Sequence, residues 1–257
     1  MPLDRRSFMR LLAGSAVAGL AAARPQARAA SKPRLGAVAF DAFPILDPHP
    51  IFALAESLFP GKGAELGNVW RTRQFEYTWL RTMGQRYVDF WHVTEDALVF
   101  AATSLGLELS ADKREQLMGK YLQLKAWPDA APALRSLKQA GVRMAFLSNF
   151  TPAMLDAGIR NSGLEGFFED HLSTDRARAF KPAARAYEMG VEAFGLPREQ
   201  IAFVASAGWD AAGAKWFGYP TVWINRAGLP VEDLSASPDA IYKDLGGLVT
   251  FVKSAAE

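Results

Sequence analysis

The chain has 257 residues, of which 50% are hydrophobic and 22% are charged. This composition is typical of a protein with a buried core and excludes a disordered chain. With no cysteine and only three histidines, disulfides, thiolate catalysis and zinc–thiolate sites are excluded, and a histidine metal centre has little support. No stretch approaches the roughly 18 uninterrupted apolar residues of a membrane span, which excludes a multi-pass membrane protein.

The small positive charge of the chain comes from its N-terminus. The 29 basic and 27 acidic residues give a formal net charge of +2. Residues 1–30 contain five arginines and one aspartate, so removing this segment's +4 leaves a net charge of −2. The remaining chain has no basic excess, and nucleic acid is not expected as a partner.

Residues 1–30 have the pattern of an export signal. Arg5-Arg6 and Phe8 precede an apolar run at 11–23, and Ala27-Arg28-Ala29 has the form of a cleavage site. The paired arginines resemble the twin-arginine signal read by the Tat translocase, which exports folded proteins; an ordinary Sec signal or an uncleaved anchor is the alternative. This run of roughly thirteen residues forms at most about 20 Å of helix, too short for a bilayer of about 30 Å. We therefore expect a signal peptide, a periplasmic product and no stable membrane association after cleavage.

Four short apolar runs predict strands that are buried on both faces of a sheet. They lie at 35–40, 142–147, 201–205 and 221–224. Helix-like segments at 130–140, 151–162, 183–194 and 211–217 lie between or beside them, and each is followed by glycine. This alternation predicts an α/β fold, a Rossmann-like parallel sheet with helices on both faces. Ligands of such sheets bind beyond the carboxyl ends of the strands.

Residues 48–128 break the alternation. Three long helix-like segments, at 65–83, 87–106 and 110–124, occur there without a convincing strand. They predict a helical cap that is inserted after the first strand, where it would cover the site and exclude water. The predicted domains are therefore a signal peptide at 1–30, a core at 31–47 and 129–257, and a cap domain at 48–128.

Asp41 ends the first predicted strand, where a parallel sheet best presents a nucleophilic carboxylate. Taken alone, an aspartate at the end of a strand is more often a helix cap or a loop residue. It is followed along the chain by Ser148-Asn149, by Lys181 before Pro182, and by Asp210 after Trp209. This order of polar residues after strands resembles the haloacid dehalogenase superfamily.

A finer resemblance, over residues 35–226, is to the L-2-haloacid dehalogenases (haloacid dehalogenase type II). It rests on Trp70-Arg71, on the run Gln74-Phe75-Glu76-Tyr77-Thr78-Trp79-Leu80-Arg81, and on segments 203–205, 209–214, 217–221 and 223–226. The resemblance implies a haloacid dehalogenase-like core and a homodimer. It also implies metal-independent hydrolysis of short (S)-2-haloalkanoic acids to 2-hydroxyalkanoic acids through an aspartyl ester, with the haloacid and water as the only reactants and no cofactor.

The residue two positions after Asp41 separates dehalogenation from phosphoryl transfer. Phosphatases of the superfamily carry a second aspartate there, which protonates the leaving group, and they hold Mg²⁺ between acidic residues. This chain has Phe43. A phenyl ring neither donates a proton nor binds magnesium, whereas a halide leaves unprotonated. An apolar wall beside the carboxylate suits a carbon electrophile, and a drier cavity strengthens interactions between charges.

The resemblance assigns roles to the polar residues. Asp41 would attack C2 with inversion, and Arg71 and Asn149 would stabilise the departing halide. Ser148 would help to hold the substrate carboxylate. Lys181 would keep the nucleophile ionised, Tyr187 would pack or hydrogen-bond nearby, and Asp210 would orient or deprotonate the hydrolytic water. The walls around the alkyl group would come from Phe43, Phe75, Phe90 and Trp209.

Each role has a structural alternative. Arg71 could be one of several surface arginines, Lys181 a solvated loop residue and Asp210 the N-cap of a helix that starts at Ala211. The aromatic residues Phe75, Phe90, Trp209 and Tyr187 could belong to the core. His49 and His92 are interpreted as structural.

The chain departs from the family at three polar positions. The loop after Asp41 carries Pro44 and no hydroxyl, and Ala205 and Ala207 stand where the family has serine and asparagine. A hydrogen bond to a charged group contributes roughly 1.5–3 kcal/mol, so uncompensated losses would slow the reaction greatly. Backbone amides, Ser206 or water could compensate. Two alternatives to dehalogenation therefore stay open: another hydrolase of this fold, such as a phosphatase, and a catalytically weakened binding protein.

Overall fold

The computed structural model describes residues 34–255. They form a six-stranded parallel sheet in the order β3-β2-β1-β4-β5-β6, which confirms the predicted fold class. The strands are β1 (Ala37–Phe40), β2 (Arg143–Ser148), β3 (His171–Ser173), β4 (Ile201–Ala205), β5 (Thr221–Ile224) and β6 (Ala240–Tyr242). The chain starts in the middle of the sheet and later crosses from β3 to β4 on the other side of β1. This reversal of strand order opens a crevice at the carboxyl end of β1.

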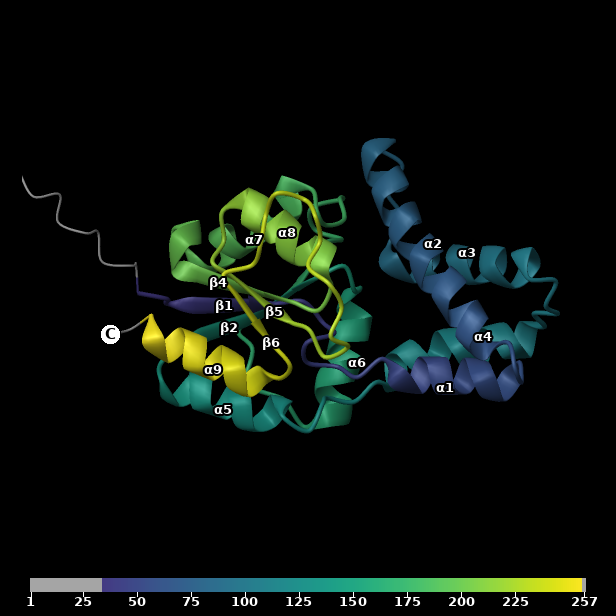
Figure 1. The fold of residues 1–257 in the computed structure, drawn as a ribbon, viewed down its shortest axis with the longest axis horizontal. Helices are drawn as coiled ribbons and strands as arrows, with labels where there is room; N and C mark the ends of the chain where they lie inside the picture. Colours follow the sequence, from purple (N-terminus) through teal and green to yellow (C-terminus); the bar gives the residue numbers. More distant parts are fainter. Residues whose placement is uncertain (1–33, 256–257) are drawn as a thin grey trace, which may run out of the picture. The chain divides into compact units, whose positions relative to one another are not determined.

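Helices cover both faces of the sheet. Figure 1 shows α5 (Ala130–Gln139) and α9 (Leu245–Ser254) on one face, and α7 (Ala184–Phe194) and α8 (Gly208–Phe217) on the other. Alternate side chains of β1 divide between two core clusters: Val38 and Phe40 belong to one, and Ala37 and Ala39 to the other. Because successive strand side chains point to opposite faces, both faces are buried, as the apolar strand sequences predict.

Four helices and a 3₁₀ turn lie between β1 and β2. They are α1 (His49–Leu58), α2 (Gly63–Met83), α3 (Phe90–Ser104), α4 (Ala111–Lys120) and η2 (Tyr121–Gln123). A single antiparallel bridge between Leu46 and Ala126 joins the two chain segments that enter and leave this helical insertion. The insertion thus occupies the place predicted from the sequence, while its description as a separate domain stays a prediction.

The remaining elements are α6 (Pro152–Ser162) and η3 (Arg198–Gln200). Helix α6 has the expected ends: Thr151 accepts a hydrogen bond from the Met154 amide, Pro152 starts the helix, and Gly163 ends it with φ at 61°. None of the helices in residues 34–255 is long and apolar enough to cross a membrane. The predicted signal peptide at 1–30 lies outside the described residues.

Helix α8 starts earlier than predicted. The residue before it is Ala207, in an extended conformation, and the helix begins at Gly208. Asp210 is therefore a residue of the first turn, and the suggestion that it caps a helix starting at Ala211 is wrong. Its side chain instead enters the buried site described below.

Candidate active site

The carboxylate of Asp41 stands at the carboxyl end of β1 and receives different donors on its two oxygens. Oδ1 accepts hydrogen bonds from Lys181 Nζ at 2.9 Å and from Ser148 Oγ at 3.1 Å. Oδ2 accepts from Ser206 Oγ at 3.1 Å and from the Phe43 amide at 3.3 Å. The cation thus contacts only Oδ1, and the two donors to Oδ2 are neutral.

Lys181 links two buried carboxylates. Its ammonium is 2.9 Å from Asp41 Oδ1 and 2.6 Å from Asp210 Oδ2, and the lysine is 1% exposed. The other oxygen of Asp210 accepts a hydrogen bond from the Tyr187 hydroxyl at 2.7 Å. The Lys181 amide donates to Asn149 Oδ1 at 3.1 Å. The alternative of a solvated Lys181 is therefore wrong, and Tyr187 is both packed and hydrogen-bonded.

Burial and charge set the ionisation of this group. Burial would raise the pKa of Asp41, but the charge and hydrogen bond of Lys181 outweigh it and keep that pKa below its ordinary value. Burial would lower the pKa of Lys181, and the two carboxylates reverse this effect and raise it. For Asp210, burial together with the charge of Asp41 raises the pKa to about 6 despite Lys181. Asp41 is therefore ionised at neutral pH, and Asp210 loses its proton near pH 6.

The Asp41 carboxylate opens into a small cavity of about 20 Å³. Every predicted site residue except Tyr187 lines it; Tyr187 lies behind Asp210. The walls are aromatic, with Phe75 and Trp209 ring centroids 5.1 Å apart and those of Phe43 and Phe150 5.1 Å apart. An apolar cavity around an ionised carboxylate excludes water from the nucleophile and admits a carbon electrophile.

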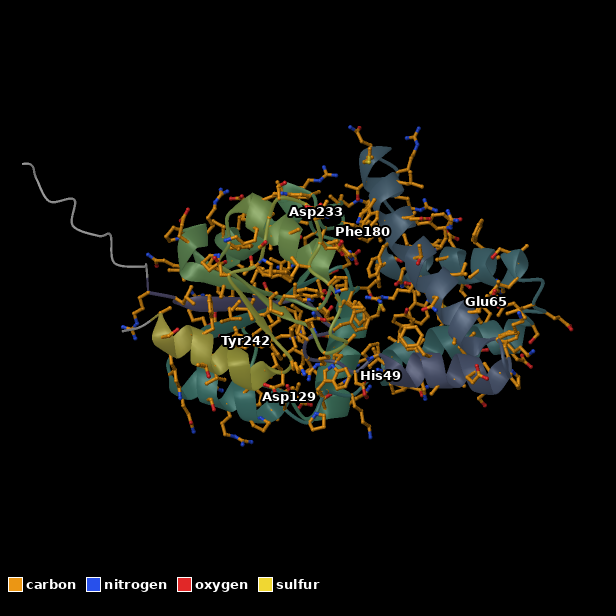
Figure 2. The ribbon with its side chains drawn as sticks, viewed as in Figure 1. His49, Glu65, Asp129, Phe180, Asp233 and Tyr242 are labelled. Atoms are coloured by element: carbon orange, nitrogen blue, oxygen red, sulfur yellow. The ribbon has the colours of Figure 1, made fainter. Side chains whose placement is uncertain are left out.

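Helix α2 brings Arg71 from the insertion to this cavity. Its guanidinium lies over the Phe75 ring, 5.6 Å from the centroid. Within residues 34–255, no hydrogen bond or ion pair involves this guanidinium. Figure 2 shows Phe180, the residue before Lys181, in the part of the core next to the insertion, and the Phe180 amide donates to Thr82 Oγ1 at 3.0 Å. The insertion thus contributes a cation to the wall of the cavity into which Asp41 opens, and it contacts the segment that carries Lys181.

Comparison with known proteins identifies the family. A sequence model for haloacid dehalogenase-like hydrolases matches residues 21–218. The chain belongs to this family. It is 42% identical to an (S)-2-haloacid dehalogenase of Pseudomonas sp. (strain YL) over 220 residues, which are 85% of this chain and 95% of that protein.

Solved structures agree with this assignment. The L-2-haloacid dehalogenase RSc1362 is 42% identical, with a TM-score of 0.84 over 86% of this chain and 100% of that chain. The L-2-haloacid dehalogenase of Xanthobacter autotrophicus with chloropropionic acid covalently bound is 33% identical, with a TM-score of 0.76 over 85% and 98% of the two chains. The chain is thus a haloacid dehalogenase-like hydrolase of the L-2-haloacid dehalogenase type.

Magnesium, which phosphatases of this superfamily use, does not fit the residues of this dehalogenase-like site. Phe43 replaces a carboxylate that would bind the metal, and the Lys181 ammonium already lies between Asp41 and Asp210. A divalent cation bound between the same two oxygens would have to displace this ammonium. Residues 34–255 contain no group of three or more acidic, histidine or cysteine side chains placed to hold a metal.

Two features of the dehalogenase-like site differ from the sequence analysis. The Ser148 hydroxyl donates to Asp41, so it is not free for a substrate carboxylate while that bond persists; its substrate role stays a prediction. Ser206, which the sequence offers only as one possible compensation for the missing polar groups, donates to Asp41 Oδ2. Its loop is fixed by Trp223 Nε1, which donates to the Ser206 carbonyl at 3.1 Å. The adjacent alanines gave no signal that the serine between them reaches the nucleophile.

Proposed function

We propose that the protein hydrolyses short (S)-2-haloalkanoic acids to 2-hydroxyalkanoic acids through an ester on Asp41, without a metal. The observation that carries this proposal is a buried carboxylate, paired with Lys181 and facing an apolar cavity that Arg71 also lines. The relatives named above support the substrate class.

In the first step, Asp41 Oδ2 attacks C2. We assign the attack to Oδ2 because its donors are neutral, whereas Oδ1 is held by an ammonium that reduces its nucleophilicity. A C2–O bond forms as the carbon–halogen bond breaks, and the halide leaves with the bonding electrons. Arg71 and the Asn149 amide nitrogen, whose partner oxygen is already used by the Lys181 amide, are placed to stabilise this anion.

In the second step, water attacks Cγ of the Asp41 ester. Asp210 accepts a proton from this water, and the negative charge that develops on Oδ1 faces Lys181 and Ser148, the donors of an oxyanion hole. The Cγ–Oδ2 bond then breaks with its electron pair on Oδ2, which takes up the proton held by Asp210, so the product hydroxyl contains the original Oδ2. The second proton of the attacking water leaves to solvent. The regenerated carboxylate carries the oxygen of water.

Halide release tests this function. The mature protein should release halide from one enantiomer of 2-chloropropionate and from haloacetates, equally with and without a chelator. Asp41→Asn should abolish the release. No release from any haloacid, or release unaffected by the substitution, would contradict the proposal.

The same assay addresses the two alternatives. A phosphatase would need Mg²⁺ and would hydrolyse a generic phosphate ester. Phe43, which cannot bind magnesium, and the Lys181 ammonium between the two carboxylates argue against this activity. A weakened binding protein would bind haloacids without releasing halide; the Ser206 hydrogen bond to the nucleophile opposes it.

We also propose export by the Tat translocase and a periplasmic location. The support is the sequence of residues 1–30, with its paired arginines, apolar run and Ala-x-Ala site. Replacing Arg5 and Arg6 by lysine should block export, so that the precursor stays in the cytoplasm with its signal peptide uncleaved. Continued export of the variant would contradict the Tat route.

A homodimer is proposed as well. Large apolar side chains are exposed on neighbouring helices of the insertion, with Leu80 and Met83 on α2 exposed by 60% and 82%, and Val99 and Phe100 on α3 by 41% and 38%. An apolar surface of this kind is suited to burial against a second copy. Sedimentation should give a dimer for the mature protein and a monomer for Met83→Glu; a monomeric wild type would contradict the proposal.

A further inference from the structure

A second cavity lies next to the catalytic cavity and is larger. Its volume is about 200 Å³. Helices α1 and α2, the turn η2 and the loop after β5 line it, and it includes His49 at the start of α1, which Figure 2 labels. Its walls are mainly aromatic and aliphatic, with Phe52, Trp70, Tyr121, Trp127 and Ile224.

The two cavities are neighbours that share walls. Phe43, Arg71, Phe75 and Ser206 line both of them. The catalytic cavity, at about 20 Å³, has room for little more than one water molecule. When the reacting carbon is at Asp41, the nearest free volume for its substituent is therefore the second cavity.

The polar groups of the second cavity are largely bonded within the protein. Gln74 Nε2 donates to Thr94 Oγ1 at 2.6 Å and to the Tyr121 hydroxyl at 3.2 Å. The Asn225 side chain exchanges two hydrogen bonds with the backbone of Leu229. Arg226 is paired with Asp129 at 2.9 Å. The exception is the Arg71 guanidinium, which lies on the wall shared with the catalytic cavity. Away from this shared wall, aromatic side chains and internally bonded polar groups favour an apolar occupant over a charged one.

We propose that the second cavity binds the apolar C2 substituent of longer 2-haloacids, with the reacting carbon at Asp41 and the alkyl or aryl chain between α2 and the loop after β5. This inference rests on the proposed dehalogenation. It extends the substrate class from short haloalkanoic acids to those with a chain of about four carbons or a phenyl ring.

Bromide release from three substrates tests the inference: 2-bromopropanoate, 2-bromohexanoate and 2-bromosuccinate. A buried methylene favours binding by about fourfold, so wild-type kcat/KM for the hexanoate should equal or exceed that for the propanoate. The charged succinate should be the poorest of the three. A hexanoate value a hundredfold below the propanoate value, or a succinate value above the hexanoate value, would overturn the proposal.

A variant tests the location. Ala227 lines the second cavity but not the catalytic one, and it is exposed in the turn after β5, where a larger side chain does not disturb the core. Ala227→Trp should lower the hexanoate-to-propanoate ratio of kcat/KM at least tenfold. Ala193→Trp, at an exposed position on α7, is the control and should leave the ratio unchanged. An unchanged ratio in Ala227→Trp would show that the C2 substituent does not bind in the second cavity. If wild-type protein released no bromide from any of the three substrates, dehalogenation itself would be refuted.

Discussion

Replacing Lys181 with methionine removes the cation between two buried carboxylates while keeping a side chain of similar length. In the structure its Nζ lies 2.9 Å from Asp41 and 2.6 Å from Asp210, and the residue is 1% exposed. Removing one partner of a buried ion pair typically costs about 3–5 kcal/mol, because the remaining charge is left uncompensated. We expect a loss of this size in the free energy of unfolding at pH 8.

The loss should be smaller at pH 5. Without the ammonium, burial raises the pKa of both carboxyl groups in the folded protein. The folded variant then binds more protons than its unfolded chain, so its stability decreases as pH rises through these raised pKa values. In the wild type the lowered pKa of Asp41 changes stability only below its ordinary value of 3.8, so its effect is constant between pH 5 and pH 8. The raised pKa of Asp210, about 6, acts as in the variant but to a smaller extent, because Lys181 limits the rise. The difference between variant and wild type should therefore increase from pH 5 to pH 8 by about 1.4 kcal/mol per unit of pKa shift.

Urea denaturation at the two pH values measures this difference. Lys215→Met is the matched control, because Lys215 forms an ion pair of 2.9 Å with Asp239 whose side chains are 28% and 39% exposed. Such a pair contributes at most about 1 kcal/mol, since solvent screens it. Equal losses for the two lysine variants, or a Lys181→Met loss that is as large at pH 5 as at pH 8, would refute the reasoning.

Three further substitutions test single groups of the site. Ser206→Ala should lower kcat/KM by about 10- to 100-fold, because the carboxylate loses the hydroxyl that fixes the orientation of Oδ2 toward the reacting carbon, whereas Ser206→Thr keeps the hydroxyl and should retain most activity; equal activity of the alanine variant and the wild type would contradict this orienting role. Tyr187→Phe removes a donor that lowers the pKa of Asp210, now about 6, so the acid limb of the pH–kcat profile should move up by about one unit; an unmoved limb would show that this carboxylate is not the base. Arg71→Met should reduce kcat by about 10²–10³ through the loss of a donor to the leaving halide, while Arg86→Met, an exposed control on the same insertion, should change it less than twofold; similar effects of both would remove the halide role.

The sheet and the approximate place of the site could be predicted because both follow from the same pattern. The runs 201–205 and 221–224 match β4 and β5, since strands buried on both faces are continuous apolar segments. Polar residues after such strands meet at one edge of a parallel sheet. This is why Asp41 and Asn149, far apart in sequence, could be expected in one site.

The elements that the sequence did not reveal lack this pattern. Strand β3 has three residues and begins with His171, and β6 is a half-exposed edge strand of three residues. Helix α1 contains proline in its first turn and has no side-chain cap, and α9 begins with Leu245-Gly246-Gly247. Glycine and proline are weak helix signals, so these segments depend on tertiary packing for their conformation.

The hydrogen bonds of the site could not be predicted either. Whether Ser148 reaches Asp41 depends on where β2 ends, and whether Ser206 reaches it depends on the loop before α8, which starts at Gly208 after the extended Ala207. The residue types therefore predict which polar side chains belong to the site. Only the structure shows which donors each oxygen of Asp41 receives.

A single turnover in ¹⁸O-labelled water tests the central claim most directly. With the protein in excess over a 2-haloacid, one ¹⁸O atom should appear in the Asp41 carboxylate, and the hydroxy acid should be unlabelled, because its hydroxyl comes from Oδ2. Peptide mass analysis locates the label. Label in the product together with an unlabelled Asp41 would mean that water attacks the substrate directly and that no ester forms.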